Sequence, residues 1–300
     1  MPTVEGEDPL CPPRLVINPC SVKIASMNEL NLAQMRILAE DLAEQASQWL
    51  RRAGRVGDVT LKADLSVVTS ADRAIQRLIV DRLASECPDH AIVGEEDQAG
   101  SSRGPGRSKV RHCWVIDPLD GTRNYTVGFP CFATSIALLE GGVPVVGVVR
   151  EHNTGLTYSA VAGDGTTLDG QTIHVCGQSV DGDRIIAFPS TKDDLTVRVL
   201  RLWVARPGLV CRNMGSTALH LALVASGAVE AAYARRCKIW DIAAGALLVI
   251  AAGGVVTRLD GSPLFPWSDD ADPGENIPTL AGTPFLHGEL LRDFSITPTG

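Results

Sequence analysis

The segment 114–122 combines residue types that could bind a divalent cation and a phosphate group. An apolar run ends in two aspartates, Asp117 and Asp120, which flank Pro118 and are followed by Gly121 and Thr122. Pro118 has a fixed φ and no N–H, so the turn is rigid. Hard divalent cations prefer oxygen ligands, which such a turn could supply. Gly121 and Thr122 would offer N–H groups at a helix start, where phosphate is favoured. The alternative is an ordinary strand followed by an Asp–Gly turn.

Three further acidic residues follow an apolar strand or open a helix. Asp72 falls in the first turn of a predicted helix, Glu95 follows a short apolar strand, and Asp241 opens a helix made almost wholly of apolar residues. Each has an explanation that needs no function. The helix dipole favours an acid at Asp72, capping favours one at Asp241, and Glu95 could belong to a solvated turn.

Apolar periodicity predicts the elements that must position these acids. Helices are expected at 28–55, 71–86, 193–205, 218–226 and from 240 to the glycines at 253–254. Strands are expected at 59–61, 91–93, 114–117, 132–139, 143–149, 157–162, 166–168, 185–189, 210–214, 231–234 and from 255. The segment from Pro266 on is expected to be rich in loops, and 98–112 to be a mobile loop.

Strands and helices alternate in the second half of the chain, which predicts α/β layering there, after an α+β N-terminal half. We therefore expect a loose extension at residues 1–26, an α+β metal-binding domain at 27–180 and an α/β domain at 181–300 that completes the active site. The boundary should lie near residues 175–185.

Composition excludes several classes of protein. The net charge is −8 and the chain has no dense basic block, so nucleic-acid binding is not expected. The longest apolar run, 242–256, is too short to span a bilayer, and no signal peptide is evident, so no membrane partner is expected. Eight cysteines without a Cys-x-x-Cys pair favour a reducing, cytoplasmic setting and argue against zinc.

Three motifs together resemble the inositol monophosphatase superfamily, a group of magnesium-dependent, lithium-sensitive phosphatases. They are Gly94-Glu95-Glu96, the segment from Trp114 to Thr122 (WVIDPLDGT), and Trp240-Asp241-Ile242-Ala243-Ala244-Gly245. They occur in the family's order and rough spacing, and the resemblance runs from about Met27 to about Pro266. It implies a layered αβαβα sandwich of the sugar-phosphatase type, a homodimer and inhibition by lithium.

The resemblance also implies roles for individual residues. Glu95, Asp117, Asp120 and the Leu119 carbonyl would bind the first Mg²⁺ ions, and Asp241 would complete a second site. Asp72 would help to hold a weaker third ion, which gives two to three Mg²⁺ per active site. The catalytic residues would be Glu95, Thr122 and Asp72, with Glu95 and Thr122 orienting the attacking water. The N–H groups of Gly121 and Thr122 would bind phosphate oxygens.

The sequence indicates the substrate less clearly than it indicates the metal-binding residues. Inositol-specific relatives have an acid seven positions before the aspartate of the Trp-Asp motif, where this chain has Ala234, followed by a basic run. That run is either a solvated turn or a contact for a leaving group with extra negative charge. The candidate substrate-binding residues are Arg212, Asn213, Gly215, Ser216, Arg236 and Lys238.

We therefore expect a phosphomonoesterase that hydrolyses a small phosphorylated metabolite, namely a polyol, sugar or nucleoside phosphate. The alternatives are a 3'(2'),5'-bisphosphate nucleotidase and a histidinol-phosphate phosphatase. A third alternative is a catalytically silent scaffold with the same fold. That alternative predicts the loss of a ligand, whereas all the predicted ligands are present in the sequence.

Overall fold

The computed structural model describes residues 30–53, 59–61, 67–96, 105–177, 182–191 and 193–296. The described residues from Leu32 on belong to one compact unit. The predicted extension at 1–26, residues 98–104 of the predicted loop at 98–112 and the boundary residues 178–181 lie outside the described residues. No described helix is both long and apolar enough to cross a membrane.

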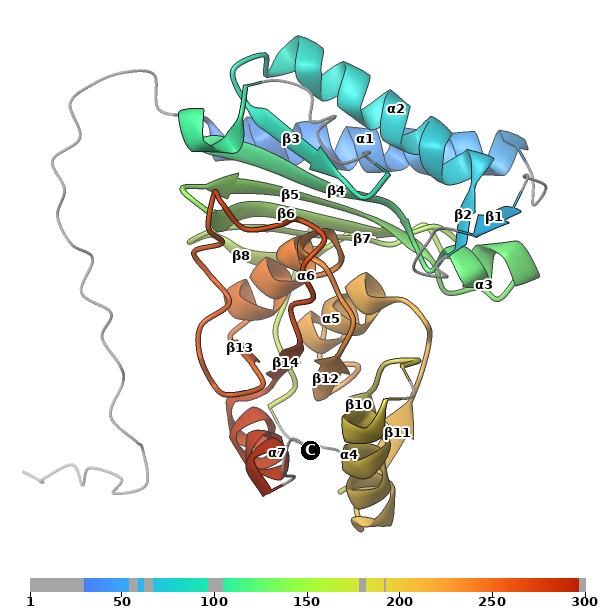
Figure 1. Ribbon diagram of the computed structural model, residues 1–300, viewed down its shortest axis with the longest axis vertical. Helices are drawn as coiled ribbons and strands as arrows, with labels where there is room; N and C mark the ends of the chain where they lie inside the picture. The colour runs from blue at the N-terminus through green and yellow to red at the C-terminus, as the bar shows by residue number, and fades with distance from the viewer. Residues whose placement is uncertain are drawn as a thin grey trace, which may run out of the picture. The chain divides into compact units, whose positions relative to one another are not determined.

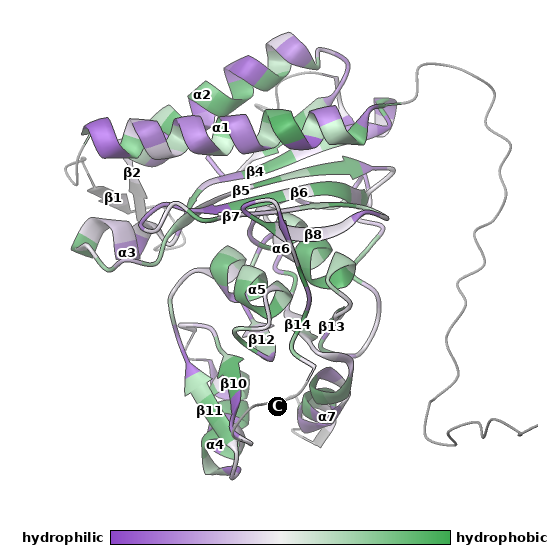
Figure 2. Ribbon diagram, turned by 180° about the vertical axis from the view of Figure 1, so that it is seen from behind, coloured by the Kyte–Doolittle hydropathy of each residue, from purple (hydrophilic) through white to green (hydrophobic). Residues whose placement is uncertain are grey.

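Two long amphipathic helices form the first layer (Figures 1 and 2). They are α1 (Leu32–Ala53) and α2 (Ser70–Glu86). Their apolar faces pack on a sheet, while the opposite faces carry charged residues. Thr69 begins α2 as its N-cap, and its side chain accepts a hydrogen bond from the N–H of Ala71.

A seven-stranded sheet forms the second layer, in the order β3-β4-β5-β6-β7-β8-β9. Its strands are β3 (Ala91–Gly94), β4 (His112–Asp120), β5 (Ala133–Glu140), β6 (Val143–Glu151), β7 (Thr157–Val161), β8 (Gly165–Leu168) and β9 (Gln171–Ile173). The first pair is parallel and the others are antiparallel. A hairpin of β1 (Val59–Leu61) and β2 (Val67–Thr69) precedes α2, a short 3₁₀ turn (Arg107–Lys109) precedes β4, and α3 (Thr122–Val127) follows it.

The middle layer consists of two helices that are apolar on nearly all sides, α5 (Thr217–Ala225) and α6 (Ile239–Ala251). They are buried because α6 packs on the seven-stranded sheet and both helices also contact the second sheet. The two helices approach each other closely at Gly245. A Cβ atom built there would lie 2.6 Å from the Leu221 Cβ, so a residue without a side chain allows this contact.

A five-stranded sheet and two helices complete the fold. The sheet order is β11-β10-β12-β14-β13, from β10 (Arg184–Ala187), β11 (Leu209–Arg212), β12 (Ala231–Ala234), β13 (Val255–Arg258) and β14 (Thr279–Gly282). Strands β11, β10 and β12 run parallel, and β14 and β13 are antiparallel additions. The outer helices are α4 (Asp194–Ala205) and α7 (Pro284–Ile296).

The predicted αβαβα layering is confirmed, and most predicted elements lie within a few residues of the observed ones. The prediction of a loop-rich segment after Pro266 was wrong in part, because β14 and α7 lie there, and β9 was not predicted. Neither segment has a long apolar pattern; α7 is stabilised by packing its buried Leu286 and Leu290 with Trp203 and Tyr233 in one core cluster. The division of the chain into two domains at residue 180 stays a prediction. The strands of the seven-stranded sheet precede this residue, and those of the five-stranded sheet follow it.

The close packing at Gly245 can be tested against a second helical glycine. Gly245→Ala should lower the free energy of unfolding by about 1–3 kcal/mol, because the new methyl group overpacks the contact with Leu221. Gly288→Ala in α7 should instead raise it by up to about 1 kcal/mol, since a Cβ there meets nothing within 4 Å and alanine favours helix. Urea unfolding of both variants measures the difference. Equal changes would contradict the packing argument.

Candidate active site

A bulge in β4 brings the first two aspartates together. Asp117 pairs with Ser135 and Asp120 pairs with Ala133, so Pro118 and Leu119 together face Thr134 alone. In a regular strand, residues three apart point to opposite faces of the sheet. The extra residue of the bulge reverses the second side chain, so both aspartates reach the same site. Proline is tolerated at a bulge because it has no N–H to pair.

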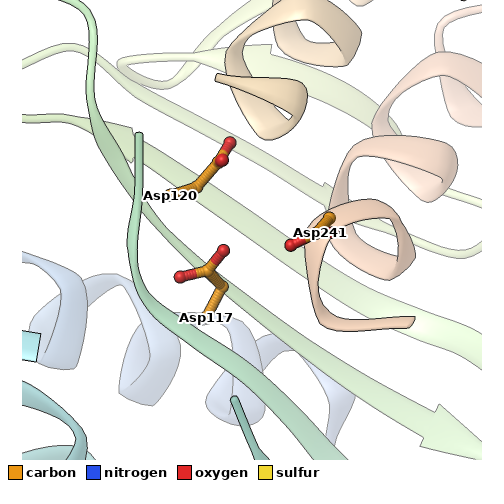
Figure 3. Close-up of side chains that lie close together, drawn as sticks. All are labelled: Asp117, Asp120 and Asp241. Carbon is orange, nitrogen blue, oxygen red and sulfur yellow. The ribbon is translucent and has the colours of Figure 1, made fainter. Parts of the chain in front are cut away.

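Asp241 completes the cluster from the other side of the site. It lies in the first turn of α6, and one carboxylate oxygen from each of Asp117, Asp120 and Asp241 lies within 4.8 Å of the others. Figure 3 shows Asp241 pointing from α6 toward the two aspartates of β4. The fold thus brings Asp120 and Asp241, which are 121 positions apart in the sequence, into one site.

The protein holds one oxygen of each carboxylate with backbone N–H groups. Asp117 Oδ1 accepts from the Leu119 N–H at 2.9 Å, and Asp241 Oδ2 accepts from the Lys238 N–H at 2.7 Å. Asp120 Oδ2 accepts from the Ala218 N–H and the Ser216 hydroxyl, both at 2.6 Å. These bonds orient the carboxylates and leave the second oxygen of each able to face a cation.

The clustered carboxylates raise one another's pKa. Burial and the charges of Glu95, Asp120 and Asp241 raise the pKa of Asp117 well above its usual value. Burial and the charges of Asp120 and Glu95 likewise raise the pKa of Asp241. Burial raises the pKa of Asp120 to about 6, with the Glu95 charge adding to it and the bonds from Ser216 and Ala218 opposing it. Closely spaced oxygen ligands whose charges repel fit a hard divalent cation.

Asp72 also belongs to the site, but side-chain and backbone donors contact both of its carboxylate oxygens. Its Oδ2 accepts from the Thr69 N–H at 2.7 Å and the Thr69 hydroxyl at 2.5 Å. Its Oδ1 lies 2.9 Å from the Thr122 hydroxyl, which is also 2.9 Å from the Leu119 carbonyl oxygen. Burial raises the Asp72 pKa, and the bonds from Thr69 and Thr122 oppose the rise. Asp72 and Thr122, 50 positions apart in sequence, therefore form a hydrogen-bonded pair.

Glu95 enters the site from the turn after β3. Its charge contributes to the raised pKa of Asp72, Asp117, Asp120 and Asp241, which places it among them. Sequence reasoning missed the residue that holds this turn: Gln76 of α2 accepts from the Glu96 N–H at 2.8 Å. Gly94 leaves space for the Gln76 side chain, because a Cβ there would lie 2.5 Å from Gln76 Cδ. The sequence signal was weak, since it shows only a glutamine beside Ile75 in a predicted helix and not its burial.

Gly121 and Thr122 begin α3, as predicted for the phosphate-binding turn. Gly121 has φ +89°, and a Cβ there would lie 2.8 Å from the Cys131 carbonyl oxygen, so glycine is required on both grounds. Sequence reasoning also missed Asn124. Its side-chain amide donates to the carbonyl oxygens of Cys131 and Met214, each at 2.6 Å, and so ties α3 to the turn before α5.

A cavity of about 580 Å³ lies beside this turn. It is lined by Arg123, Asn124, Thr126, Val127, Phe129, Ser190, Asn213, Met214 and Gly215. Two predicted substrate-binding residues, Asn213 and Gly215, thus share it, while Ser216 instead contacts Asp120.

The three predicted basic contacts do not line this cavity. Arg212 is exposed and bonds the Cys211 carbonyl, Arg236 is exposed, and the Lys238 ammonium bonds the Gly274 carbonyl. The cation at the cavity is Arg123, which was not predicted. Its signal was its position, directly after the Gly-Thr turn.

The layered fold and the converging carboxylates define a class of phosphatase that works with bound metal. The chain belongs to the inositol monophosphatase family, because the model of the family described as "Inositol monophosphatase family" matches residues 31–295. Members of this family are phosphoric monoester hydrolases, so the predicted family and enzyme class are confirmed.

Individual relatives support this assignment. The chain is 34% identical over 281 residues to an inositol-1-monophosphatase of Synechocystis, covering 90% of this chain and 89% of the relative. It is 36% identical over 240 residues to a histidinol-phosphatase of Mycobacterium tuberculosis, covering 75% of this chain and 87% of the relative. A chloroplastic phosphatase of Arabidopsis thaliana is 36% identical over 217 residues, 68% of this chain, and the chain spans only 56% of its length.

A solved structure has the same fold. The extragenic suppressor protein suhB of Bartonella henselae superposes with a TM-score of 0.77 at 29% identity, covering 87% of this chain and 98% of that one.

The raised pKa values predict how pH affects the metal-free protein. Asp120 has a higher pKa in the folded chain than in the unfolded chain, so its contribution to stability falls as pH rises from about 4 through about 6. Mg²⁺ should relieve the repulsion between the ionised carboxylates. We therefore expect a larger rise in melting temperature with Mg²⁺ at about pH 8 than at about pH 5.5, where protons compete.

Thermal unfolding with EDTA and with Mg²⁺ at each pH measures this effect. Asp241→Asn is the control: it should be more stable than the wild type without metal at the higher pH and should respond less to Mg²⁺. A Mg²⁺ response that does not vary with pH would contradict the assignment of repulsion to this cluster.

Proposed function

We propose that this protein is a Mg²⁺-dependent phosphomonoesterase that hydrolyses a small polyol or sugar phosphate. The observation that carries the proposal is the convergence of Asp117, Asp120 and Asp241. These aspartates, with Glu95 and the Leu119 carbonyl, would hold two to three Mg²⁺ ions in each active site. When bound, the ions would lower the pKa of water and neutralise charge on the phosphate oxygens.

The pair of Asp72 and Thr122 would accept the proton of the attacking water. When the Thr122 hydroxyl donates to Asp72 Oδ1, its oxygen can accept a hydrogen bond from water. Burial raises the pKa of Asp72, which makes it a stronger base. Three hydrogen bonds from Thr69 and Thr122 use three of the roughly four acceptor positions of the Asp72 carboxylate, so Asp72 would act as a base through Thr122 and could still help to hold a weaker third ion.

The phosphate would bind where α3 begins. The N–H groups of Gly121 and Thr122 are at the first turn, where backbone donors have no partner within the helix. Glu95, whose charge acts on all three clustered aspartates, would orient the attacking water.

The leaving group would extend toward the cavity beside Gly215. Arg123, Ser190 and Asn213 give the cavity polar groups that suit hydroxyls or a second anion, and Phe129 and Met214 give it apolar surface. Arg123 favours a leaving group with added negative charge, as in the bisphosphate alternative. The similarity to a histidinol-phosphatase favours histidinol phosphate instead, which carries a cationic amine. Arg212, Arg236 and Lys238 stay predicted contacts for a larger substrate.

We also propose a homodimer, inhibition by lithium and a cytoplasmic setting. The first two are supported by membership of the family. The third is supported by the cysteines: the six that the structure describes are free thiols, which favours a reducing compartment.

Asp117→Asn tests the proposed metal site. It should reduce Mg²⁺-dependent phosphate release by about 100-fold or more, since it removes charge from a ligand that the cluster shares. The variant should stay folded, and without metal it should be at least as stable as the wild type because one repelling charge is lost. Phosphate release and circular dichroism measure both outcomes. Asp164→Asn, in an exposed turn, is the matched control and should retain full turnover.

A substrate panel tests the cavity. The panel is inositol 1-phosphate, fructose 1,6-bisphosphate, histidinol phosphate and 3'-phosphoadenosine 5'-phosphate. If Arg123 binds a second anion, Arg123→Gln should lower kcat/KM by about 10-fold for the bisphosphates, equivalent to about 1.4 kcal/mol, and change it little for inositol 1-phosphate.

Arg236→Gln is the matched control for the panel. A larger effect at Arg236 would restore the sequence-based prediction for the basic run and remove Arg123 from substrate binding. If histidinol phosphate is the best substrate and Arg123→Gln improves it, the histidinol-phosphatase alternative is correct.

A further inference from the structure

A chain of polar side chains, three of them buried, contacts the β4 bulge from the face opposite the aspartate cluster. The Thr134 hydroxyl lies 2.7 Å from the Pro118 carbonyl oxygen and 2.9 Å from Nε2 of His152. On the other side of the imidazole, Nδ1 lies 2.6 Å from the Ser47 hydroxyl of α1. Arg150 Nε donates to Ser47 at 3.0 Å. None of these four side chains belongs to the aspartate cluster or lines the cavity.

Only one arrangement of hydrogens satisfies all of these contacts. The Pro118 carbonyl can only accept, so Thr134 donates to it and must accept from His152 Nε2. His152 is neutral, because burial lowers its pKa to about 3, so its single N–H is on Nε2. Nδ1 therefore accepts from Ser47, whose oxygen accepts from Arg150. Every donation runs in one direction, from the Arg150 guanidinium to the metal-binding turn.

The chain is anchored at its far end by partly exposed residues, and its inner part is buried. Arg150 also donates to the Thr157 hydroxyl and pairs with Glu44 of α1. The side chains of Thr134, Ser47 and His152 are all buried. In a buried setting an unpaired polar group is costly, so the loss of one bond would leave its neighbours unsatisfied.

The chain ends at the peptide that shapes the proposed metal site. Thr134 is the one residue that faces the bulge formed by Pro118 and Leu119. With the Pro118 carbonyl bound to Thr134, the next carbonyl, that of Leu119, points to Thr122 in the active site. The orientation of these two peptides fixes how Asp117 and Asp120, on either side of them, face each other.

We propose that Thr134, held by His152, Ser47 and Arg150, is a positioning residue that fixes the Pro118 peptide and thereby the geometry of the cation ligands. This inference rests on the proposed metal site. Partners that orient metal ligands typically change metal affinity by about 10–100-fold when they are removed.

Titration calorimetry with Mn²⁺ tests the proposal on the full-length, metal-stripped protein, independently of turnover. Thr134→Val keeps the shape of the side chain but removes the hydroxyl, and should weaken Mn²⁺ binding by about 10-fold or more. Thr134→Ser restores the hydroxyl and should recover most of the affinity. The matched control is Thr166→Val. Thr166 lies in β8, is buried to the same degree, and donates a hydrogen bond to the Leu248 carbonyl at 2.7 Å. It should leave Mn²⁺ binding unchanged.

The outcomes separate this proposal from the proposed function. If Thr134→Val binds Mn²⁺ as the wild type does, or if Thr166→Val loses as much affinity, the positioning role is wrong while the metal site stands. If the wild type binds no better than Asp117→Asn, the metal site itself is wrong and the positioning role with it. If Thr134→Val does not fold, Ser47→Ala takes its place: it should weaken Mn²⁺ binding in the same direction but less, and unchanged binding would overturn the role.

A second measurement tests the direction of the hydrogen bonds. The ¹⁵N spectrum of His152 in the wild type should show a neutral ring that is protonated on Nε2, at the pH used for Mn²⁺ binding. In Ser47→Ala this preference should weaken, because Nδ1 loses its donor. Protonation on Nδ1 in the wild type would overturn the chain of donors.

Discussion

The mutual repulsion of closely spaced carboxylates is the constraint on which the rest of this structure depends. Asp117, Asp120 and Asp241 lie within 4.8 Å of one another, and each has a raised pKa because of burial and neighbouring charge. Such a cluster opposes folding unless protons or cations neutralise it. The surrounding elements must therefore hold the three groups in place, and the molecule is organised around that requirement.

The restraint comes from both faces of the seven-stranded sheet. On one face, the N-termini of α5 and α6 bring N–H groups to Asp120 and Asp241, and the Ser135 hydroxyl donates to the Trp240 carbonyl at 3.2 Å, which ties β5 to α6. On the other face, α1 covers the side chains that contact the Pro118 carbonyl. The middle helices can approach this closely because Gly245 faces Leu221 without a side chain. The cluster thus depends on contacts far from it in sequence.

Sequence reasoning found the parts of the site that have a local pattern. An acid after an apolar strand or at the start of an apolar helix is visible in one segment, so Asp117, Asp120 and Asp241 could be named together, and their convergence in the fold agrees with that grouping. The bulge could not be seen, because register depends on the partner strand, and spacing alone would have put Asp117 and Asp120 on opposite faces. Helix α7 was missed because tertiary packing, not a long periodic pattern, stabilises it.

The residues that hold the site were missed for a related reason. Gln76 and Asn124 each make hydrogen bonds to backbone groups of another element, and those partners are fixed only in the fold. No other histidine lies within four positions of His152, so the sequence contains no signal of a shared site, and its observed partners are 105 and 18 positions away. A buried polar residue has a partner, but a single sequence does not identify it. The roles of these residues follow from the hydrogen bonds alone.

The contrast between Asp72 and the cluster shows how one site can contain acids with different functions. Asp72 and Asp117 are both buried, yet Asp72 accepts three hydrogen bonds from Thr69 and Thr122, whereas Asp117 accepts one from a backbone N–H. Donors that satisfy a carboxylate replace part of the water it loses, so the bonds from Thr69 and Thr122 oppose the rise that burial causes in the pKa of Asp72. Asp117 has fewer donors and three acidic neighbours, and its pKa is raised well above the usual value. Hydrogen bonds to both of its oxygens therefore distinguish Asp72, the candidate base, from the candidate metal ligand Asp117.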